Sequence, residues 1–394
     1  MRLKFKLTLG VVAISIFIML CTILVVYLVL DKQNRENVNT DLAKSLNIVR
    51  DDLVKRQEKI VADSLQMIKV NKVAESVKFL SEYGDMGIAT LASSYVGIAS
   101  ALRQNLVTGG LWQSAVYGVD GQLQTYVRRS GEQRVSTGYI HFDKKNGRTV
   151  YQSEAGDDDA LDDVDWISSS DLSLADIDES LNRTPSETAA SAMVEMGDRL
   201  YLMSIAPVMG SAYDPEADAM KAVLVGTVVS YQNLGADFVE GLATLTGTQL
   251  NLYRADGSLS AGTLPDYAQL QAGAVDKENA SSELISKRPS YNAVDLEQGG
   301  YLQAMLTLNA GDRPAGWLTA LAPASEARAN TRQMIGLLGV VFLICLVIVL
   351  PVAYLFGGTF ARAATTVVTR LKDIAEGEGD LTMRIELNNR DEMG

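Results

Sequence analysis

Two long apolar segments stand out in the pattern of hydrophobic and polar positions along the chain. Residues 7–30 and 334–358 contain no charged residue, and each is longer than the roughly 20 apolar residues that a helix needs to cross about 30 Å of hydrocarbon. A cleaved signal peptide has an apolar core of only about 7–15 residues. Because residues 7–30 exceed that length, the pattern predicts two retained transmembrane helices.

Between these spans, the chain first shows a helical pattern over residues 31–104. Apolar side chains recur along this segment with charged residues between them, and no proline interrupts it. Gly84 and Gly87 mark the one bend that the pattern predicts. We expect a long helix whose apolar stripe packs either on a second copy of the chain, giving a homodimer, or on its own domain.

The middle of the chain is typical of strands and turns. Gln113–Tyr126 and Thr248–Ala261 each contain a strand, an Asp-Gly turn and a second strand. Asp-Gly between alternating strands is a strong hairpin signal, because glycine adopts the positive φ that the turn requires. With the amphipathic segment Leu234–Leu245 between the copies, we expect two antiparallel sheet modules, over 105–233 and 234–328. Two unrelated hairpin runs in one larger α+β domain are the alternative.

The chain is therefore predicted to be an α+β protein in which two membrane helices flank a long helix and two sheet modules. This order resembles the double Cache sensor domains of bacterial transmembrane receptors, which are built from PAS-like folds. The resemblance covers residues 31–332. It implies a sensor whose membrane-distal module, residues 105–233, binds a small molecule.

Basic residues flank both spans and predict their orientation. Positively charged flanks stay in the cytoplasm. We expect a two-pass protein of a bacterial inner membrane, with residues 31–332 outside and residues 1–6 and 359–394 in the cytoplasm. The basic residues are Arg2, Lys4, Lys6, Arg362, Arg370 and Lys372.

The segment after the second span predicts a signal relay. An apolar stripe of heptad-like spacing ends at Gly377 and Gly379, and alternating apolar and polar residues follow. Helix, extended connector and helix after a membrane span resemble a HAMP domain, and the run GEGDLTMRI is most similar to the form in methyl-accepting chemotaxis receptors. The proline common early in the first HAMP helix is replaced by Ala363 and Ala364. The resemblance implies relay roles for Leu371, Ile374, Gly379, Leu381, Ile385, Glu392 and Gly394.

The sequence stops one residue into the expected second HAMP helix. We therefore expect either a piece of a longer chain or a fragmentary gene product, with the output domain missing.

Charge and reactive residues narrow the chemistry. The net charge of −13 disfavours nucleic acid as a partner. Cys21 and Cys345 both lie in the spans, so no disulfide is expected outside. His141, the single histidine, is expected to be an exposed residue on a strand, and it leaves no multi-histidine metal site. We expect no catalytic constellation, no metal and no cofactor.

An acidic run and a group of aromatic residues are the candidate binding features. Asp157–Asp165 could supply oxygen ligands to Ca²⁺, but its spacing is not that of an EF-hand loop and favours a solvated loop. Arg128 could hold a carboxylate in a bidentate pair. The amino-acid-binding pattern of double Cache domains is not present in recognisable spacing, so the ligand stays open. The candidate ligand-binding residues are Tyr117, Tyr126, Arg128, Tyr139, Tyr151, Trp166 and Tyr201.

The favoured hypothesis is a homodimeric chemoreceptor that binds an extracytoplasmic small molecule and relays the signal through HAMP to chemotaxis proteins. A first alternative is the input portion of a sensor histidine kinase or diguanylate cyclase. A second is a docking module for a periplasmic solute-binding protein.

Overall fold

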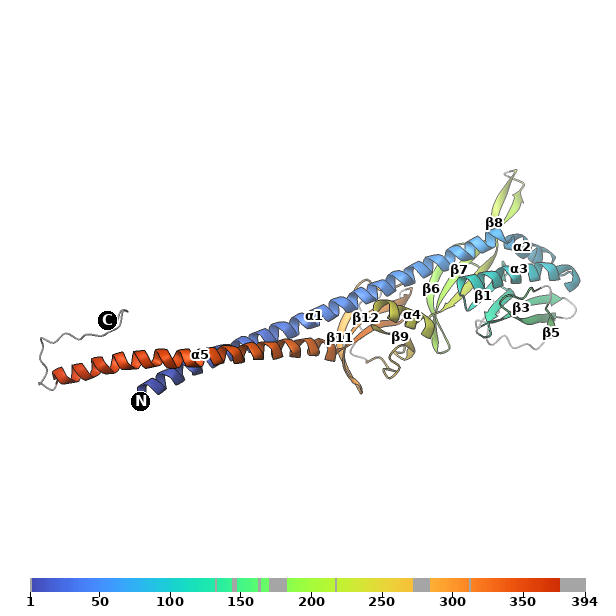
Figure 1. Cartoon of the computed structure of the whole chain (residues 1–394). Helices are drawn as coiled ribbons and strands as arrows, with labels where there is room; N and C mark the ends of the chain where they lie inside the picture. Colours follow the sequence, from blue (N-terminus) through green and yellow to red (C-terminus); the bar gives the residue numbers. More distant parts are fainter. Residues whose placement is uncertain are drawn as a thin grey trace. The chain divides into compact units, whose positions relative to one another are not determined.

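A computed structural model describes residues 2–131, 133–143, 147–161, 164–169, 183–216, 218–271, 284–311 and 313–375. The chain forms two compact units. One is Asn39–Ala322, and the other combines the segment through Val38 with the segment from Pro323 onward. Figure 1 shows the elements and their order.

Two helices have the length and composition of membrane spans. They are α1 (Arg2–Val70) and α5 (Ala324–Ala375). Their most apolar windows have mean hydropathies of 3.0 and 3.1, and no residue in either window is buried within the protein. Asn34 of α1 donates a hydrogen bond of 2.7 Å from Nδ2 to Oγ1 of Thr331 in α5. The expectation of two apolar helices at the ends of an α+β chain is confirmed.

The helical segment after the first span is broken twice. Helix α1 ends at Val70, and α2 (Val73–Tyr83) and α3 (Ile88–Gly109) follow. The bend at Gly84 and Gly87 is present. At the first break Lys72 adopts the left-handed conformation, at φ 53°. Glycine is the residue that usually does so, and no glycine marks this position in the sequence.

The first sheet has eight strands in the order β5-β4-β3-β2-β1-β8-β7-β6, and all neighbours are antiparallel. Helices α2 and α3 lie against one of its faces (Figure 1). The strands are β1 (Gln113–Gly118), β2 (Leu123–Arg129), β3 (Arg134–Asp143), β4 (Gly147–Gly156), β5 (Ile167–Ser169), β6 (Ala190–Met196), β7 (Arg199–Asp214) and β8 (Ala219–Asn233).

The second sheet has five strands in the order β10-β9-β13-β12-β11, and helix α4 precedes it and contacts β9 and β10. Its last strand passes into α5 without an intervening residue. The elements are α4 (Ala236–Thr246), β9 (Gln249–Arg254), β10 (Leu259–Gly262), β11 (Ser290–Leu296), β12 (Gly299–Ala310) and β13 (Arg313–Pro323).

The two predicted Asp-Gly hairpins open these sheets. Gly121 and Gly257 have φ values of 78° and 81°. In each turn the aspartate accepts a backbone hydrogen bond two residues on, at 3.0 Å for Asp120 and 2.8 Å for Asp256. The same local chemistry therefore starts both sheets.

The turn between β6 and β7 joins the first sheet to the second. Leu200 donates a backbone hydrogen bond of 3.0 Å to Oγ of Ser260. Arg254 forms an ion pair of 3.0 Å with Glu195. Because these contacts come from both sheets, the sheets are linked by specific polar contacts beyond the chain connection.

Candidate ligand-binding face of the first sheet

The face of the first sheet opposite α2 and α3 carries a row of polar and aromatic side chains. Arg128, Gln113, Tyr231 and Met203 are directly opposed across β2, β1, β8 and β7. Directly opposed residues in antiparallel strands project from the same face. The sheet register therefore places these four side chains next to one another.

Gln113 is the unusual member of this row. It is completely buried, and neither its amide oxygen nor its amide nitrogen has a hydrogen-bond partner within the described part of the chain. Most buried polar atoms in native proteins are hydrogen-bonded, and leaving one unpaired costs about 1–3 kcal/mol. A bound ligand that both donates and accepts a hydrogen bond would remove that cost.

Two arginines bring positive charge to the row. Arg183 donates to the hydroxyl of Tyr231 at 2.9 Å and to the sulfur of Met203 at 3.0 Å. Its backbone N–H donates to the carbonyl of Gly121 at 2.7 Å, which fixes the arginine beside the β1–β2 turn. The Arg128 guanidinium lies 5.9 Å from the ring centre of Trp112. Two guanidinium groups on an aromatic face are suited to a carboxylate.

Tyr126 adds a phenol to the same face. Its ring lies over Gly138, where a Cβ atom would collide with it, and its hydroxyl accepts a hydrogen bond from Gln152. Burial raises the pKa of Tyr126 to about 12, against the lowering effects of the Gln152 hydrogen bond and the Arg128 charge. The phenol therefore keeps its proton throughout the physiological pH range.

The structure divides the predicted ligand-binding residues between the two faces of the sheet. Tyr117, Tyr126 and Tyr201 belong to the same core cluster as Tyr231 and Met203, and Arg128 lies in that row. Tyr117 is completely buried, and Tyr201 packs on Trp112 with ring centres 4.9 Å apart.

Tyr139, Tyr151 and Trp166 lie on the other face, below α3. Tyr139 stacks on Tyr95 of α3 at 4.8 Å, and both Tyr151 and Trp166 lie 4.9 Å from Tyr139 between ring centres. Burial, and then the neighbouring Tyr151, raise the pKa of Tyr139 to about 12. This cluster joins helix to sheet and is separated by the sheet from the Arg128 row.

The sequence interpretation missed Gln113, Arg183 and Tyr231. Gln113 had a weak signal, because it is a polar residue at the inward-facing phase of an otherwise apolar strand. Arg183 had none, because it lies outside any regular element.

His141 is buried, contrary to the expectation of an exposed residue. It is 4% exposed and meets the ring of Tyr95 edge-on at 6.4 Å. His141 is buried because α3 covers the face of β3 that it shares with Tyr139, and the pattern of the strand alone does not show that cover.

The first residues of the acidic run form hydrogen bonds with other residues of the same chain. Both carboxylate oxygens of Asp157 accept hydrogen bonds of 2.8 Å from Arg129. Asp159 accepts a backbone hydrogen bond of 2.7 Å from Gly156. No group of three or more potential metal-ligating side chains occurs among the described residues, and Asp162 and Asp163 lie outside them.

The predicted relay residues fall at the end of the described chain. Leu371 and Ile374 belong to the last turns of α5, and Leu371 is 56% exposed. The others lie outside the described residues, namely Gly379, Leu381, Ile385, Glu392 and Gly394.

Comparisons with known proteins find similarity only among solved structures. No protein-family model matches the chain, and no curated protein matches it. The chain is similar to the sensory domain of a Campylobacter jejuni chemoreceptor, at 8% identity and a TM-score of 0.40 over 76% of this chain and 98% of that one. It is also similar to the ligand-binding domain of that chemoreceptor in complex with L-norvaline. The sequence identity is 9% and the TM-score 0.39, over 75% of this chain and 94% of that one.

A third similar structure is the sensor domain of the histidine kinase DctB from V. cholerae, at 9% identity and a TM-score of 0.37 over 74% of this chain and 98% of that one. Because all three TM-scores lie below 0.5, the candidate site is assigned from this chain's own residues.

Proposed function

We propose that the chain is the input part of a transmembrane chemoreceptor that binds a small carboxylate-bearing solute on the first sheet. The buried and unpaired amide of Gln113 carries this proposal. It lies between Arg128 and Tyr231, so a solute that offers a carboxylate and a hydrogen-bonding group would meet all three.

The connection from β13 into α5 supports a relay. Strand β13 ends at Pro323, and α5 begins at Ala324 and continues to Ala375. Pro351 inside α5 removes one backbone hydrogen bond, but the helix continues on both sides of it, so a displacement of its first turn can be passed along its length. In the proposed receptor the solute shifts the sheets, α5 moves in the membrane, and a HAMP-like segment after residue 375 passes the change to chemotaxis proteins.

Calorimetric titration of the full chain in nanodiscs tests the binding site. A panel of small carboxylates, amino acids included, is compared with the corresponding amides. We expect at least one carboxylate to bind and Arg128→Gln to weaken it by at least tenfold. Arg134→Gln is the matched control, because that arginine is on the same sheet and its side chain is 71% exposed. If no carboxylate binds, or if both variants bind equally, the site is wrong.

Cysteine labelling tests the proposed orientation. In a chain with Cys21 and Cys345 replaced by alanine, a cysteine at Lys69 should react with a membrane-impermeant maleimide in intact cells. A cysteine at Thr366 should react only after lysis. The reverse result would contradict a cytoplasmic C-terminal segment. Mass photometry of the same nanodiscs measures whether the receptor is the proposed homodimer.

A further inference from the structure

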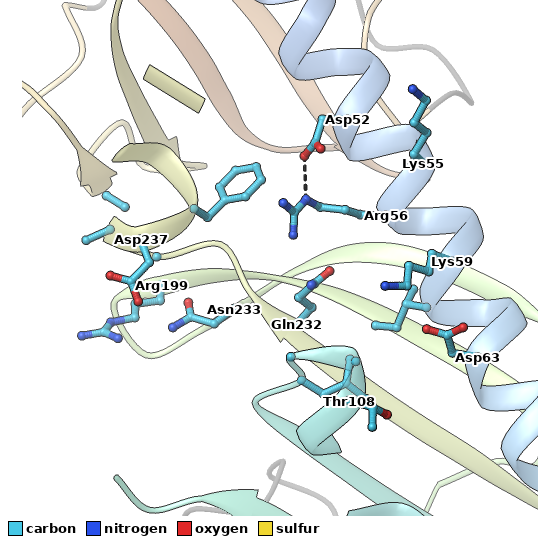
Figure 2. Close-up of a pocket in the computed structure, with 18 of the residues that line it drawn as sticks. Asp52, Lys55, Arg56, Lys59, Asp63, Thr108, Arg199, Gln232, Asn233 and Asp237 are labelled. Atoms are coloured by element: carbon cyan, nitrogen blue, oxygen red, sulfur yellow. Dashed lines mark hydrogen bonds and ion pairs between the residues drawn. The ribbon is translucent and has the colours of Figure 1, made fainter. Parts of the chain in front are cut away.

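A cleft of about 910 Å³ opens beyond the end of the Arg128 row (Figure 2). Its walls come from α1, the C-terminal end of α3, the last residues of β8, the start of α4 and part of β10. None of Gln113, Arg128 and Arg183 lines it. The cleft is therefore separate from those three residues, and it is bordered by elements that belong to both sheets.

Basic residues of α1 line this cleft. Lys55, Arg56 and Lys59 line it, and Figure 2 shows Arg56 and Lys59 projecting from the helix toward Gln232. Residues three and four apart on a helix lie on one face. Arg199, at the start of β7, adds a fourth basic group, which also forms an ion pair of 3.8 Å with Asp198. Three carboxylates also line the cleft, so its walls carry a positive excess in a chain of net charge −13.

The basic groups are only partly neutralised. Arg56 forms an ion pair of 2.5 Å with Asp52 and lies 5.1 Å from the ring centre of Phe238. Lys55 and Lys59 form no ion pair within the described chain. Both lysines are exposed at the cleft, so an anion can approach them without displacing a carboxylate partner.

Two amide side chains in the walls have unsatisfied atoms. Asn105 of α3 is 7% exposed, and its Nδ2 has no hydrogen-bond partner within the described chain. The buried Oδ1 of Asn233 also lacks one there. Buried amides without partners are rare in native proteins. This observation is independent of the charge pattern, and a ligand oxygen at Asn105 would give its Nδ2 a hydrogen-bond partner.

The start of α4 contributes a further feature for an anion. This helix of 11 residues begins after Gly235, which supplies no side-chain cap. The first N–H groups of a helix are unpaired, and the helix dipole favours negative charge there. Gly235, Ala236 and Asp237 all line the cleft, and the Asp237 carboxylate in the first turn already meets part of this preference for negative charge.

We propose that this cleft is a second ligand site, for a small solute that bears two acidic groups. Lys59 holds one acidic group, Arg199 and the start of α4 hold the other, and a rotated Asn105 amide donates to a ligand oxygen. The ligand touches α1, the start of β7, the end of β8 and the start of α4. Its binding therefore stabilises one arrangement of the two sheets on the long helix. It is a second input to the protein that does not depend on the Arg128 row.

Titration of the full chain in nanodiscs of neutral phospholipid tests this site. The probes are succinate, inorganic phosphate and the neutral succinamide. We expect succinate to bind, and Lys59→Gln and Asn105→Leu each to weaken binding at least tenfold. Lys69→Gln is the matched control, because Lys69 is exposed on the same helix and does not line the cleft. Phosphate binding with the same dependence on Lys59, in place of succinate, would assign the site to phosphate-bearing solutes.

Two outcomes overturn the proposal. One is that neither anion binds or that Lys59→Gln and Asn105→Leu bind as tightly as the unmodified chain. The other is that Arg128→Gln abolishes binding and Lys59→Gln does not, which moves the anion to the first-sheet face and leaves the proposed function intact. Because Lys59 is exposed, its variant tests the cleft even if Asn105→Leu fails to fold.

Discussion

The two sheets begin with the same Asp-Gly hairpin, but they place the small and the large residue of one cross-strand pair on opposite strands. In the first sheet, the small Ala115 is opposite the large Tyr126. In the second, at the same distance from the Asp-Gly turn, the polar Asn251 is opposite Gly262. A Cβ atom at Gly262 would collide with the Asn251 side chain, so the glycine makes the room that Asn251 occupies.

This exchange separates a closed polar network in the second hairpin from an open one in the first, and Gln303 of β12 is the other fully buried glutamine whose amide has no partner in the described chain. Asn251 donates from Nδ2 to Tyr253 and to the carbonyl of Leu264, both at 2.9 Å, and its Oδ1 accepts from the N–H of Leu264 at 3.0 Å. Tyr253 then donates to the carbonyl of Tyr267 at 2.9 Å. The first sheet instead leaves Gln113 unpaired within the described chain. The comparison teaches that one hairpin plan can hold either a completed polar network or, in the proposed receptor, a polar group left for a ligand.

Alkaline pH should produce the largest effect and act on both sheets. Burial raises the pKa of Tyr126 to about 12 and raises the pKa of Tyr253. Between pH 10 and 12 the unfolded chain has lost phenolic protons that the folded chain keeps. The contribution of these phenols to stability should therefore be constant below pH 10 and fall as the pH rises through 12. Urea unfolding of the full chain in detergent at each pH measures this.

Separate readouts tell whether the two sheets respond together. The chain has three tryptophans. Trp317 belongs to the core of the second sheet, and Trp112 packs on the core of the first. Single-tryptophan chains, with the other two replaced by phenylalanine, report each sheet. Stability that rises above pH 10 in either sheet would contradict the burial of these phenols.

Asn251→Ala should be the most damaging single substitution in the comparison. It leaves the backbone N–H and carbonyl of Leu264 buried without their partner, and we expect a loss of about 3 kcal/mol from the second sheet. Trp317 fluorescence in urea measures it. The control is Gln249→Ala in the same strand, whose amide oxygen has no partner in the described chain and should matter little. Equal losses in both variants would disprove the closed network.

Gly138→Ala should destabilise the first sheet by about 2 kcal/mol, because the new methyl group overlaps the Tyr126 ring and forces it to move. Trp112 fluorescence in urea reports the change. Gly131→Ala is the control, since its nearest neighbouring atom would be 3.9 Å away. An unchanged midpoint for Gly138→Ala would mean that Tyr126 is free to leave its place over β3.

The sequence predicted the elements that depend on local chemistry. The two apolar helices and both Asp-Gly hairpins followed from composition and turn geometry. The break at Lys72 was missed because a left-handed lysine leaves no trace in the apolar pattern.

The candidate site was less predictable because faces are set by long-range packing. Alternation along β3 groups Tyr139 with His141, but only the position of α3 shows that both lie away from Arg128. The register of β1 with β2 also shifts between Val116 and Tyr117. The face on which a residue of β1 lies therefore does not by itself give the face of a residue on β2. Arg183 comes from a segment without a periodic pattern, and only tertiary structure brings it to Tyr231.

Gln113→Leu should have the smallest effect on stability and the most telling effect on binding. The substitution removes two buried polar atoms that have no partner in the described chain, so we expect the stability of the first sheet to stay the same or to rise by up to about 1 kcal/mol. Binding of the carboxylate that depends on Arg128 should weaken at least tenfold. Trp112 fluorescence and calorimetry measure the two quantities on one preparation.

The pair of results distinguishes an open polar core from a closed one. If Gln113→Leu destabilised the first sheet as Asn251→Ala destabilises the second, Gln113 would be satisfied inside the folded protein and the contrast between the sheets would fail. If Gln113→Leu left both stability and binding unchanged, the Gln113 amide would not contact the ligand. Lost binding with retained stability is the combination that a residue kept for a ligand should give, because its hydrogen bonds are completed only when the solute is present.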